Sequence, residues 1–293
     1  MKQSMKRLNI RVLYLFLLCS VGLLIWWVVF VPRDAASTKK ILFHVEKGEG
    51  SREIAYHLEQ QGIIRSAPMF RVYALTRGIS GRLQAGNYLL SPSLSMAQIA
   101  EKLAKGDIAT EKLKIVEGWN IQDITNYLAD RGFAVSISPE LEGYLFPDTY
   151  LVSRGISGET LIEIMRKNFE KKFDATLKQE TEKQNKTVHD IVTMASLIEK
   201  EVQTREDKRI VAGILWKRLQ YGIALQVDAE PQTYKQRGLP LAPIANPGLE
   251  SIKAALYPQE SPYLYYLSAK KDGETIFSKT LEEHNIAKAR YLK

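Results

Sequence analysis

Residues 12–31 constrain this chain more than any other segment, because they form an uninterrupted apolar run without a charged residue. As a helix rising 1.5 Å per residue, such a run matches the roughly 30 Å hydrocarbon core of a bilayer. Trp26 and Trp27, near the end of the run, are typical of the membrane interface. The sequence therefore predicts an N-terminal transmembrane helix at 12–31, preceded by a tail at 1–11 and followed by a linker at 32–40.

The residues on either side of this run indicate whether it is retained as an anchor and how it is oriented in the membrane. A cleaved signal peptide, the main alternative, would have a shorter apolar region of about 7–15 residues and a small-residue cleavage site. Residues 34–37 match such a cleavage site poorly. The basic residues before the run stand without an acid, which predicts a cytoplasmic N-terminus. We therefore expect a single-pass protein of the inner or plasma membrane whose larger part is periplasmic or extracellular. The basic residues before the run are Lys2, Lys6, Arg7 and Arg11.

Charge and residue usage exclude several classes of function. Of the formal net charge of +8, four charges belong to the N-terminal tail, and the remainder is too dispersed for a nucleic-acid surface. The single cysteine, Cys19, lies inside the apolar run, so neither a disulfide framework nor thiol catalysis is expected. The histidines lack metal-ligand spacing, and no phosphate-binding glycine loop, nucleophile elbow or zincin helix is present. We expect no metal and no cofactor, which leaves carboxylate chemistry. The histidines are His44, His57, His189 and His284.

An internal repeat follows the linker. Residues 45–48 are echoed 70 positions later by residues 115–118, and Gly62 is matched by Gly132. Each copy predicts a short strand, a turn at a glycine and a helix closed by glycine. Short β-α units beside a membrane anchor resemble LysM-type modules, which bind the glycan backbone of cell walls. We expect a small LysM-like β-α module at 41–110; a docking domain without its own ligand is the alternative.

The rest of the chain, residues 111–293, predicts a larger α+β domain. Residues 210–219 form an amphipathic helical pattern. Residues 263–267 and 275–277 are strand-like and flank Lys271-Asp272-Gly273, which signals a hairpin. The fold class expected for the whole chain is therefore α+β, with a transmembrane helix, a small module and a larger domain.

The helical pattern at residues 188–202 carries a carboxylate in an unusual place. Glu199 lies about 50° from the centre of the apolar stripe, whereas Glu201 lies about 110° from it. A carboxyl group packed against apolar residues loses hydration in its charged form, which favours the protonated acid that general acid catalysis needs. Glu199 is therefore the candidate catalytic residue; a solvated charge at the border of the helix is the alternative. The apolar stripe comprises Val188, Ile191, Val192, Ala195, Ile198 and Val202.

Three further segments have the composition of a binding site. Residues 142–150 mix aromatic, hydroxyl and acidic side chains, as sugar sites often do. Residues 225–228 predict a strand that presents Gln226 and Asp228 on one face and apolar residues on the other. Residues 238–248 contain three prolines, and a loop stiffened in this way can form a wall of a cleft at little entropic cost. Each segment taken alone is equally consistent with a structural role.

Taken in order, these segments are similar to one family. Residues 142–150, the Glu199 helix, residues 225–228, residues 238–248 and residues 277–285 follow one another as in the endolytic murein transglycosylases, also called YceG-like proteins. The resemblance covers nearly all of the chain after the apolar run. It implies a lyase that cleaves peptidoglycan strands internally, between N-acetylmuramic acid and N-acetylglucosamine, and leaves 1,6-anhydromuramic ends. It also implies partnership with peptidoglycan synthases and a role in ending strand elongation.

The resemblance also implies roles for individual residues. The acid would be the first glutamate of the Glu-Lys-Glu motif, Glu199, which would protonate the glycosidic oxygen and then accept the proton of the muramic acid O6 hydroxyl. Gln226 and Asp228 are the first candidates for orienting sugar hydroxyls or Glu199. Tyr144, Asn246 and His284 follow as substrate-binding candidates.

The chain departs from the family at two places. Ala229 stands where the family has Pro-Thr and a longer insert, and Thr275 stands where a histidine is frequent. Both departures bear on the length of substrate accommodated more than on the reaction. Two other functions are consistent with the residues: a membrane-anchored wall-binding scaffold without activity, and a glycan hydrolase in which Asp148 or Asp228 activates water.

Overall fold

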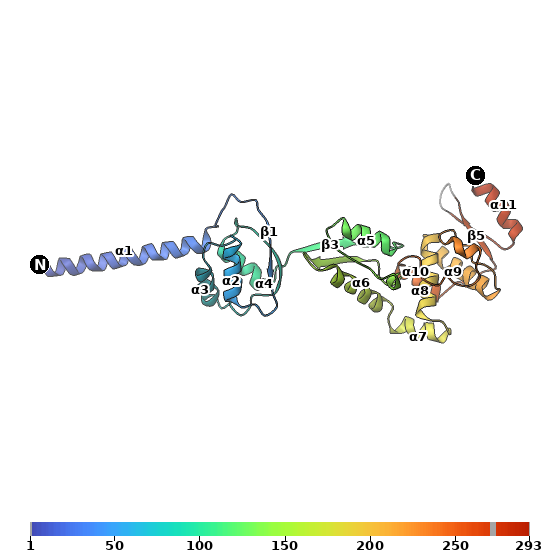
Figure 1. Ribbon diagram of the computed structural model, residues 1–293, viewed down its shortest axis with the longest axis horizontal. Helices are drawn as coiled ribbons and strands as arrows, with labels where there is room; N and C mark the ends of the chain where they lie inside the picture. The colour runs from blue at the N-terminus through green and yellow to red at the C-terminus, as the bar shows by residue number, and fades with distance from the viewer. Residues whose placement is uncertain (1, 270–273, 293) are drawn as a thin grey trace. The chain divides into compact units, whose positions relative to one another are not determined.

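The protein, described here by a computed structural model covering residues 2–269 and 274–292, divides into two compact units. Unit 1 comprises Met1–Glu111 with Leu151–Gly155, and unit 2 comprises Lys112–Tyr150 with Ile156–Lys293. Both contain helices and short strands (Figure 1), so the predicted mixture of α and β structure is confirmed.

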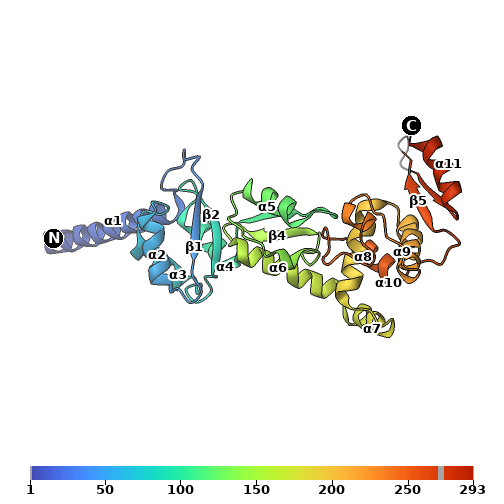
Figure 2. The same ribbon diagram turned by 45° about the vertical axis from the view of Figure 1, so that its right-hand side comes forward.

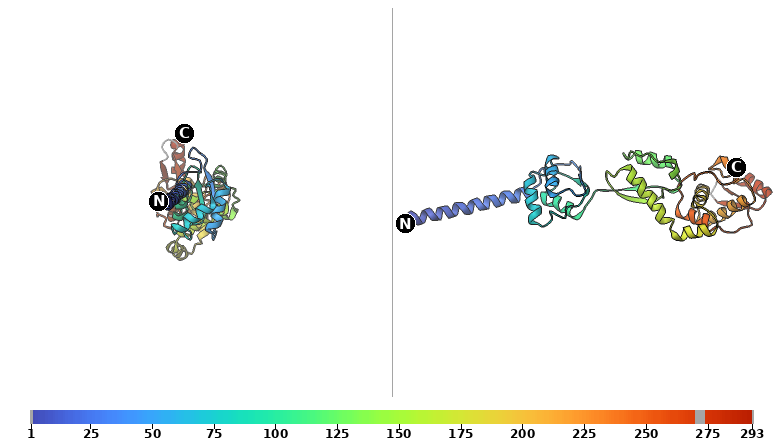
Figure 3. Two further views of the ribbon diagram at one scale, coloured as in Figure 1. Left: turned by 90° about the vertical axis from the view of Figure 1, so that its left-hand side faces the viewer. Right: turned by 60° about the horizontal axis from the view of Figure 1, so that its bottom comes forward.

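The chain begins with one long apolar helix, α1 (Lys2–Phe30). Its segment Leu13–Phe30 is long and apolar enough to cross a membrane, and only 6% of it is buried in the protein. Figure 3 shows α1 leaving the rest of unit 1 as a single helix. Length and composition thus agree with the predicted span. The side chains of Lys2, Lys6, Arg7 and Arg11, on which the predicted orientation depends, lie outside the described part of the structure.

The end of α1 is fixed to the body of unit 1. Val29 is 4% exposed and belongs to the core of the unit. The Arg65 guanidinium lies 4.2 Å from the centre of the Trp27 ring, and Arg65 donates hydrogen bonds to the carbonyls of Val31 (2.6 Å) and Arg33 (3.2 Å). Arg33 in turn donates to the carbonyl of Ile64 (3.0 Å). The predicted linker therefore starts with a segment that is held in place.

Unit 1 is built on two antiparallel strands. In β1 (Ile41–Val45) and β2 (Gly86–Leu90), Phe43 pairs with Tyr88, and both side chains are fully buried. The helices α2, α3 and α4 pack against this pair with their apolar residues. Ser95 and Gln98 form a capping box that fixes the start of α4. The helix bounds are α2 (Ser51–Gln60), α3 (Ala67–Thr76) and α4 (Met96–Lys105).

The internal repeat is visible in the local structure. The helix α2 is closed by Gly62 with φ of +71°, and α5 (Ile121–Ala129) is closed by Gly132 with φ of +82°. In each copy the glycine N–H and the following N–H donate back into the last turn, at 2.9 to 3.0 Å. Strand β3 (Thr110–Lys114), which precedes α5, corresponds to β1 and pairs with β4 (Thr149–Ser153).

The core of unit 2 is helical. Figure 2 shows α8, α9 and α10 packed together, and their buried residues form one continuous apolar cluster. The hairpin of β5 and β6 lies beside α11, and its predicted turn, Lys271–Gly273, lies outside the described residues. The remaining bounds are α6 (Gly158–Lys172), α7 (Ala175–Lys183), α8 (Val188–Glu201), α9 (Arg205–Gln220), α10 (Leu249–Leu256), β5 (Tyr265–Ser268), β6 (Thr275–Ser278) and α11 (Leu281–Tyr291), with 3-10 turns at Pro139–Leu141 and Pro231–Tyr234.

Helix α8 has clear start and stop signals. Thr187 caps its N-terminus in a capping box with Asp190, and Val202 is extended, which ends the helix one residue after Glu201. The predicted apolar stripe is buried except for Val188, which is half-buried. Helix α10 makes the most extensive contact with α8. Helix α8 is therefore a rigid support for the carboxylates at its C-terminal end.

Gly143 allows the segment before β4 to pass close to α8. A Cβ at this position would lie 2.7 Å from both Pro243 Cβ and Val192 Cγ1, and its φ of +87° favours glycine. We expect Gly143→Ala to lower the free energy of unfolding by about 2–4 kcal/mol, from overpacking and backbone strain together. Gly222→Ala is the matched control, because Gly222 also has positive φ (+64°) but has no atom within 4 Å of an added Cβ. Urea denaturation of both variants separates the two contributions; equal losses would contradict the packing argument.

Candidate active site

Glu199 is a buried, fully bonded carboxylate. Its Oε1 accepts from Lys208 Nζ at 2.9 Å, and its Oε2 accepts from Ser251 Oγ at 2.6 Å and from the Gly248 N–H at 3.0 Å. The side chains of Glu199 and Lys208 are only 8% and 6% exposed. Glu199 thus lies on the inner side of its helix, as the helical wheel predicted, and it is held there by three donors.

A second carboxylate lies near this ion pair. Glu117, in the turn after β3, approaches Gly248 so closely that a Cβ on that glycine would lie 2.0 Å from its Oε1. Burial raises the pKa of the Glu117 carboxyl, and the charge of Glu199 raises it further. A Cβ on the neighbouring Gly118 would lie 3.5 Å from Glu199 Cγ, so this glycine also lies beside the Glu199 side chain. Two segments far apart in sequence, residues 117–118 and 248–251, therefore enclose Glu199.

Glu201, two residues further along α8, lies on the wall of a cavity of about 360 Å³. Burial raises the pKa of its carboxyl, and the charge of Asp228 adds to the rise. The Ala229 N–H donates to Glu201 Oε1 at 3.4 Å, which partly opposes it. Glu201 therefore combines access to a cavity with an environment that favours the protonated acid.

Gln226 and Asp228 line the same cavity as Glu201. The predicted alternation is correct, since Leu225 and Val227 are fully buried while Gln226 and Asp228 are exposed. The predicted strand is wrong: residues 225–228 are irregular, because Gln226 adopts a left-handed conformation with φ of +54°. Arg218 holds this conformation through a short hydrogen bond to Gln226 Oε1.

His284 also lines this cavity, 8% exposed, and stacks on Tyr265 with ring centres 5.3 Å apart. Burial lowers the pKa of its imidazole, and the charges of Lys288 and Arg218 lower it further. The imidazole is therefore neutral near pH 7 and offers a donor or an acceptor to a hydroxyl group. Its Nδ1 has no hydrogen-bond partner among the described residues.

The other two sequence candidates lie elsewhere. Asn246 is fully buried, and its amide bonds to the Leu145 N–H (2.8 Å), the Trp119 carbonyl (3.0 Å) and Glu142 Oε1 (3.1 Å). Tyr144 contacts His189, with 3.2 Å between the Tyr144 hydroxyl and Nδ1. Neither lines the cavity of Glu201. In this structure Asn246 ties three segments together and offers no surface to a sugar.

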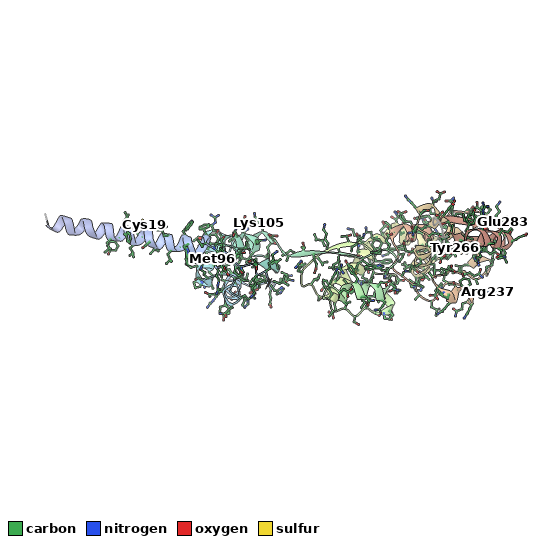
Figure 4. All side chains as sticks on the ribbon, turned by 90° about the horizontal axis from the view of Figure 1, so that it is seen from above. Cys19, Met96, Lys105, Arg237, Tyr266 and Glu283 are labelled. Carbon is green, nitrogen blue, oxygen red and sulfur yellow. The ribbon has the colours of Figure 1, made fainter. Side chains whose placement is uncertain are left out.

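Four residues of the site are not among the candidates predicted from the sequence. Arg218 donates to the Ala224 carbonyl at 2.9 Å as well as to Gln226, and it is 4% exposed. Tyr234 donates a short hydrogen bond to Asp228, and burial together with Asp228 raises the pKa of Tyr234 to about 12. Tyr266, labelled in Figure 4, lines the cavity, and burial raises its pKa well above 10. The fourth is Lys208. For Arg218, the sequence does contain a signal. This arginine follows Leu215 by three residues and Ile214 by four, which places a charge on the apolar face of α9.

Residues able to hold a metal ion are not grouped in this site. Within the two described ranges, no three His, Cys, Asp or Glu side chains are arranged for coordination. The cavity offers instead two carboxyl groups, an amide, an imidazole and phenolic hydroxyls. Such a set suits recognition of sugar hydroxyls and proton transfer to an oxygen.

Comparison with known proteins identifies the family of this chain. The model of the YceG-like family matches residues 43–232 and 231–290, which is most of the chain. The chain belongs to the YceG-like family. A curated YceG-like relative, the endolytic murein transglycosylase of Bacillus subtilis, is 31% identical, with 89% of this chain and 87% of the relative covered.

Two further relatives extend the comparison. The endolytic murein transglycosylase of Streptococcus pneumoniae is 25% identical over 87% of this chain, which spans 59% of that longer protein. The crystal structure of a YceG-like protein from Listeria monocytogenes is 32% identical and superposes with a TM-score of 0.54. That comparison covers 85% of this chain and 99% of the Listeria chain. The predicted family is thereby confirmed.

Proposed function

We propose that this YceG-like protein is an endolytic lytic transglycosylase of peptidoglycan, cleaving between N-acetylmuramic acid and N-acetylglucosamine. Two curated relatives bear the name endolytic murein transglycosylase, and they align over 87–89% of this chain. The observation that carries the proposal is a carboxyl group on the wall of a polar cavity, with a pKa raised by burial. This is the arrangement that protonation of a glycosidic oxygen requires.

One carboxyl group performs both proton transfers in this mechanism. As the acid, it gives its proton to the oxygen that joins C1 of muramic acid to the neighbouring sugar, and the C1–O bond breaks. Positive charge develops at C1 and on the ring oxygen. The O6 hydroxyl of the same muramic acid then bonds to C1 and returns its proton to the carboxylate. The acid is regenerated, the product has a 1,6-anhydro end, and no water is consumed.

The contacts favour Glu201 over Glu199 as this acid. Glu199, the residue assigned from the sequence, is paired with Lys208 and bonded to Ser251 and Gly248, so both of its oxygens already have donors. Glu201 faces the cavity together with Gln226 and Asp228. We propose that Glu201 transfers the proton, and that the Glu199–Lys208 pair holds the C-terminal turn of α8 against α10.

The product distinguishes this reaction from its alternatives. We expect mass spectrometry of a peptidoglycan digest to show fragments ending in 1,6-anhydromuramic acid, without the mass of an added water molecule. Only reducing ends would indicate a hydrolase, with Asp148 or Asp228 activating water. Binding to glycan strands without any cleavage would indicate a wall-binding scaffold. Either result would overturn the proposed reaction.

The dependence of the rate on pH tests the role of Glu201. The acid must be protonated, so the rate should fall as the pH rises through the elevated pKa of Glu201. Asp228→Asn removes a charge that raises this pKa, and we expect the descending limb of the kcat profile to move to lower pH. Glu230→Gln removes a charge two residues away that does not line the cavity, and it should leave the limb in place. An unmoved limb in Asp228→Asn would indicate that another group titrates.

Further aspects of the function extend beyond the cavity. We propose that α1 spans the plasma or inner membrane with the N-terminus in the cytoplasm, which places both units on the peptidoglycan side. The module at 41–110, with its two strands enclosing two helices, would bind glycan as LysM-type modules do. Cleavage near the membrane would end the elongation of nascent strands beside peptidoglycan synthases. In this assignment residues 111–293 form the catalytic domain.

A further inference from the structure

A cavity of about 840 Å³ in unit 1 lies next to the end of the apolar helix. Its wall includes Phe30, the last residue of α1, and Pro32, together with residues of α3, of α4 and of the segments before α4. The function proposed above makes no use of this cavity. Its chemistry and its position both indicate a ligand.

The position follows from how α1 is attached. The segment Leu13–Phe30, 18 residues at 1.5 Å each, is about 27 Å long and thus spans the hydrocarbon core. Its end at Phe30 reaches the depth of the lipid headgroups, and Trp27 lies one helical turn before it. Because Val29 is buried in unit 1 and Arg65 fixes the residues that follow, this unit cannot separate from the end of the helix. The cavity wall at Phe30 and Pro32 is therefore held at the surface of the bilayer.

The charges of the cavity are complementary to an anion. Three cationic side chains line it, Arg77, Arg82 and Lys105, against a single carboxylate, Glu101. Glu101 is already paired with Lys105 at 2.7 Å, whereas neither arginine has a carboxylate within ion-pairing distance among the described residues. Figure 4 marks Lys105 at the edge of unit 1. Two unpaired guanidinium groups beside apolar walls suit a phosphate whose other side continues into hydrocarbon.

We propose that this cavity, the membrane-proximal cavity, binds the headgroup of an anionic phospholipid from the bilayer that α1 spans. Basic pockets at the end of a membrane span recognise such headgroups through charge and the forked donors of arginine. The phosphatidylcholine headgroup carries a quaternary ammonium that the same three cations repel. The inference rests on α1 spanning the membrane, and it is independent of the cleavage reaction.

Native mass spectrometry of the full chain in detergent tests this. We expect the chain to retain one phosphatidylglycerol at least about tenfold more tightly than phosphatidylcholine. The triple variant R77Q/R82Q/K105Q should lose this preference, to within about threefold. The control triple K47Q/R52Q/R71Q removes the same charges from exposed positions of unit 1 that do not line the cavity. It should keep the preference, because only local charges are in contact with the headgroup.

Each other outcome overturns the proposal. Equal retention of both lipids by the natural chain would show that the cavity does not select anionic headgroups, and equal losses in both triples would show diffuse attraction. Inorganic phosphate in large excess should leave the phosphatidylglycerol in place; displacement would indicate a site for a soluble anion. Formation of anhydro ends, measured on the same preparations, reports separately on the proposed function, because none of the substituted residues lines the cavity of Glu201.

Discussion

Replacing Glu201 with glutamine should reduce the rate of anhydro-end formation by about 100-fold to 10,000-fold, the usual contribution of a positioned acid. Glutamine has the same shape and can still accept the Ala229 N–H, so the cavity should keep its form. It cannot give a proton to the glycosidic oxygen or take one from O6. The measurement is the release of anhydromuramic fragments from uncrosslinked glycan strands, with binding to the strands as a parallel readout that should stay within about threefold.

Glu199→Gln is the matched comparison. It changes the same group on the same helix, and it should mainly lower stability, because it leaves Lys208 buried without its counter-charge. The activity of the fraction that remains folded should exceed that of Glu201→Gln by at least about tenfold. A folded but inactive Glu199→Gln beside an active Glu201→Gln would return the acid to Glu199, as the sequence alone predicts.

Lys208→Met should lower the free energy of unfolding by about 3–5 kcal/mol, the effect of removing one partner from a buried ion pair. Methionine has nearly the length of lysine, so the main change is the loss of the charge that faces Glu199 Oε1 at 2.9 Å. The carboxylate keeps the Ser251 and Gly248 donors but lies in a site with little access to water. Urea denaturation of unit 2 within the full chain measures the loss.

The double variant Glu199→Gln with Lys208→Met removes both charges. We expect it to be more stable than the sum of the two single losses predicts, by about 1–3 kcal/mol, because no unpaired charge remains buried. Strictly additive losses would show that the two side chains act independently and would contradict the structural role proposed for the pair. Lys200→Met is a control on an exposed neighbour and should change stability by less than about 0.5 kcal/mol.

The sequence predicted well those features that depend on local periodicity. The apolar run, the helix that carries Glu199 and the repeated strand–turn–helix pattern are all present, since each is specified by residues close together in the chain. The helical wheel also placed Glu199 correctly on the inner side of α8. What the wheel could not show is the partner, because Lys208 comes from the next helix and Ser251 from α10.

The candidate site shows the same limit. Alternating polarity at 225–228 correctly separates Gln226 and Asp228 from the buried Leu225 and Val227, yet it predicts a strand where the backbone is irregular. The left-handed conformation of Gln226 depends on Arg218, which is distant in the pattern but adjacent in space. Asn246 is a substrate-binding candidate by resemblance, but it is fully buried and its amide bonds only to the protein, which composition does not reveal. Tertiary contacts, rather than local preference, decide these positions.

The attachment of α1 also limits how this protein can search for its substrate. An enzyme joined to its membrane anchor by a long flexible linker samples a large volume above the bilayer, and its effective concentration falls as the linker lengthens. With α1 spanning the bilayer as proposed, the chain that follows it is held at once by Arg65 and by the core around Val29, so unit 1 is fixed at the lipid surface. Unit 1 can diffuse laterally with α1, but its distance from the bilayer is fixed. Lengthening residues 35–40 with glycine and serine should leave this height unchanged, because the grip lies before the insertion.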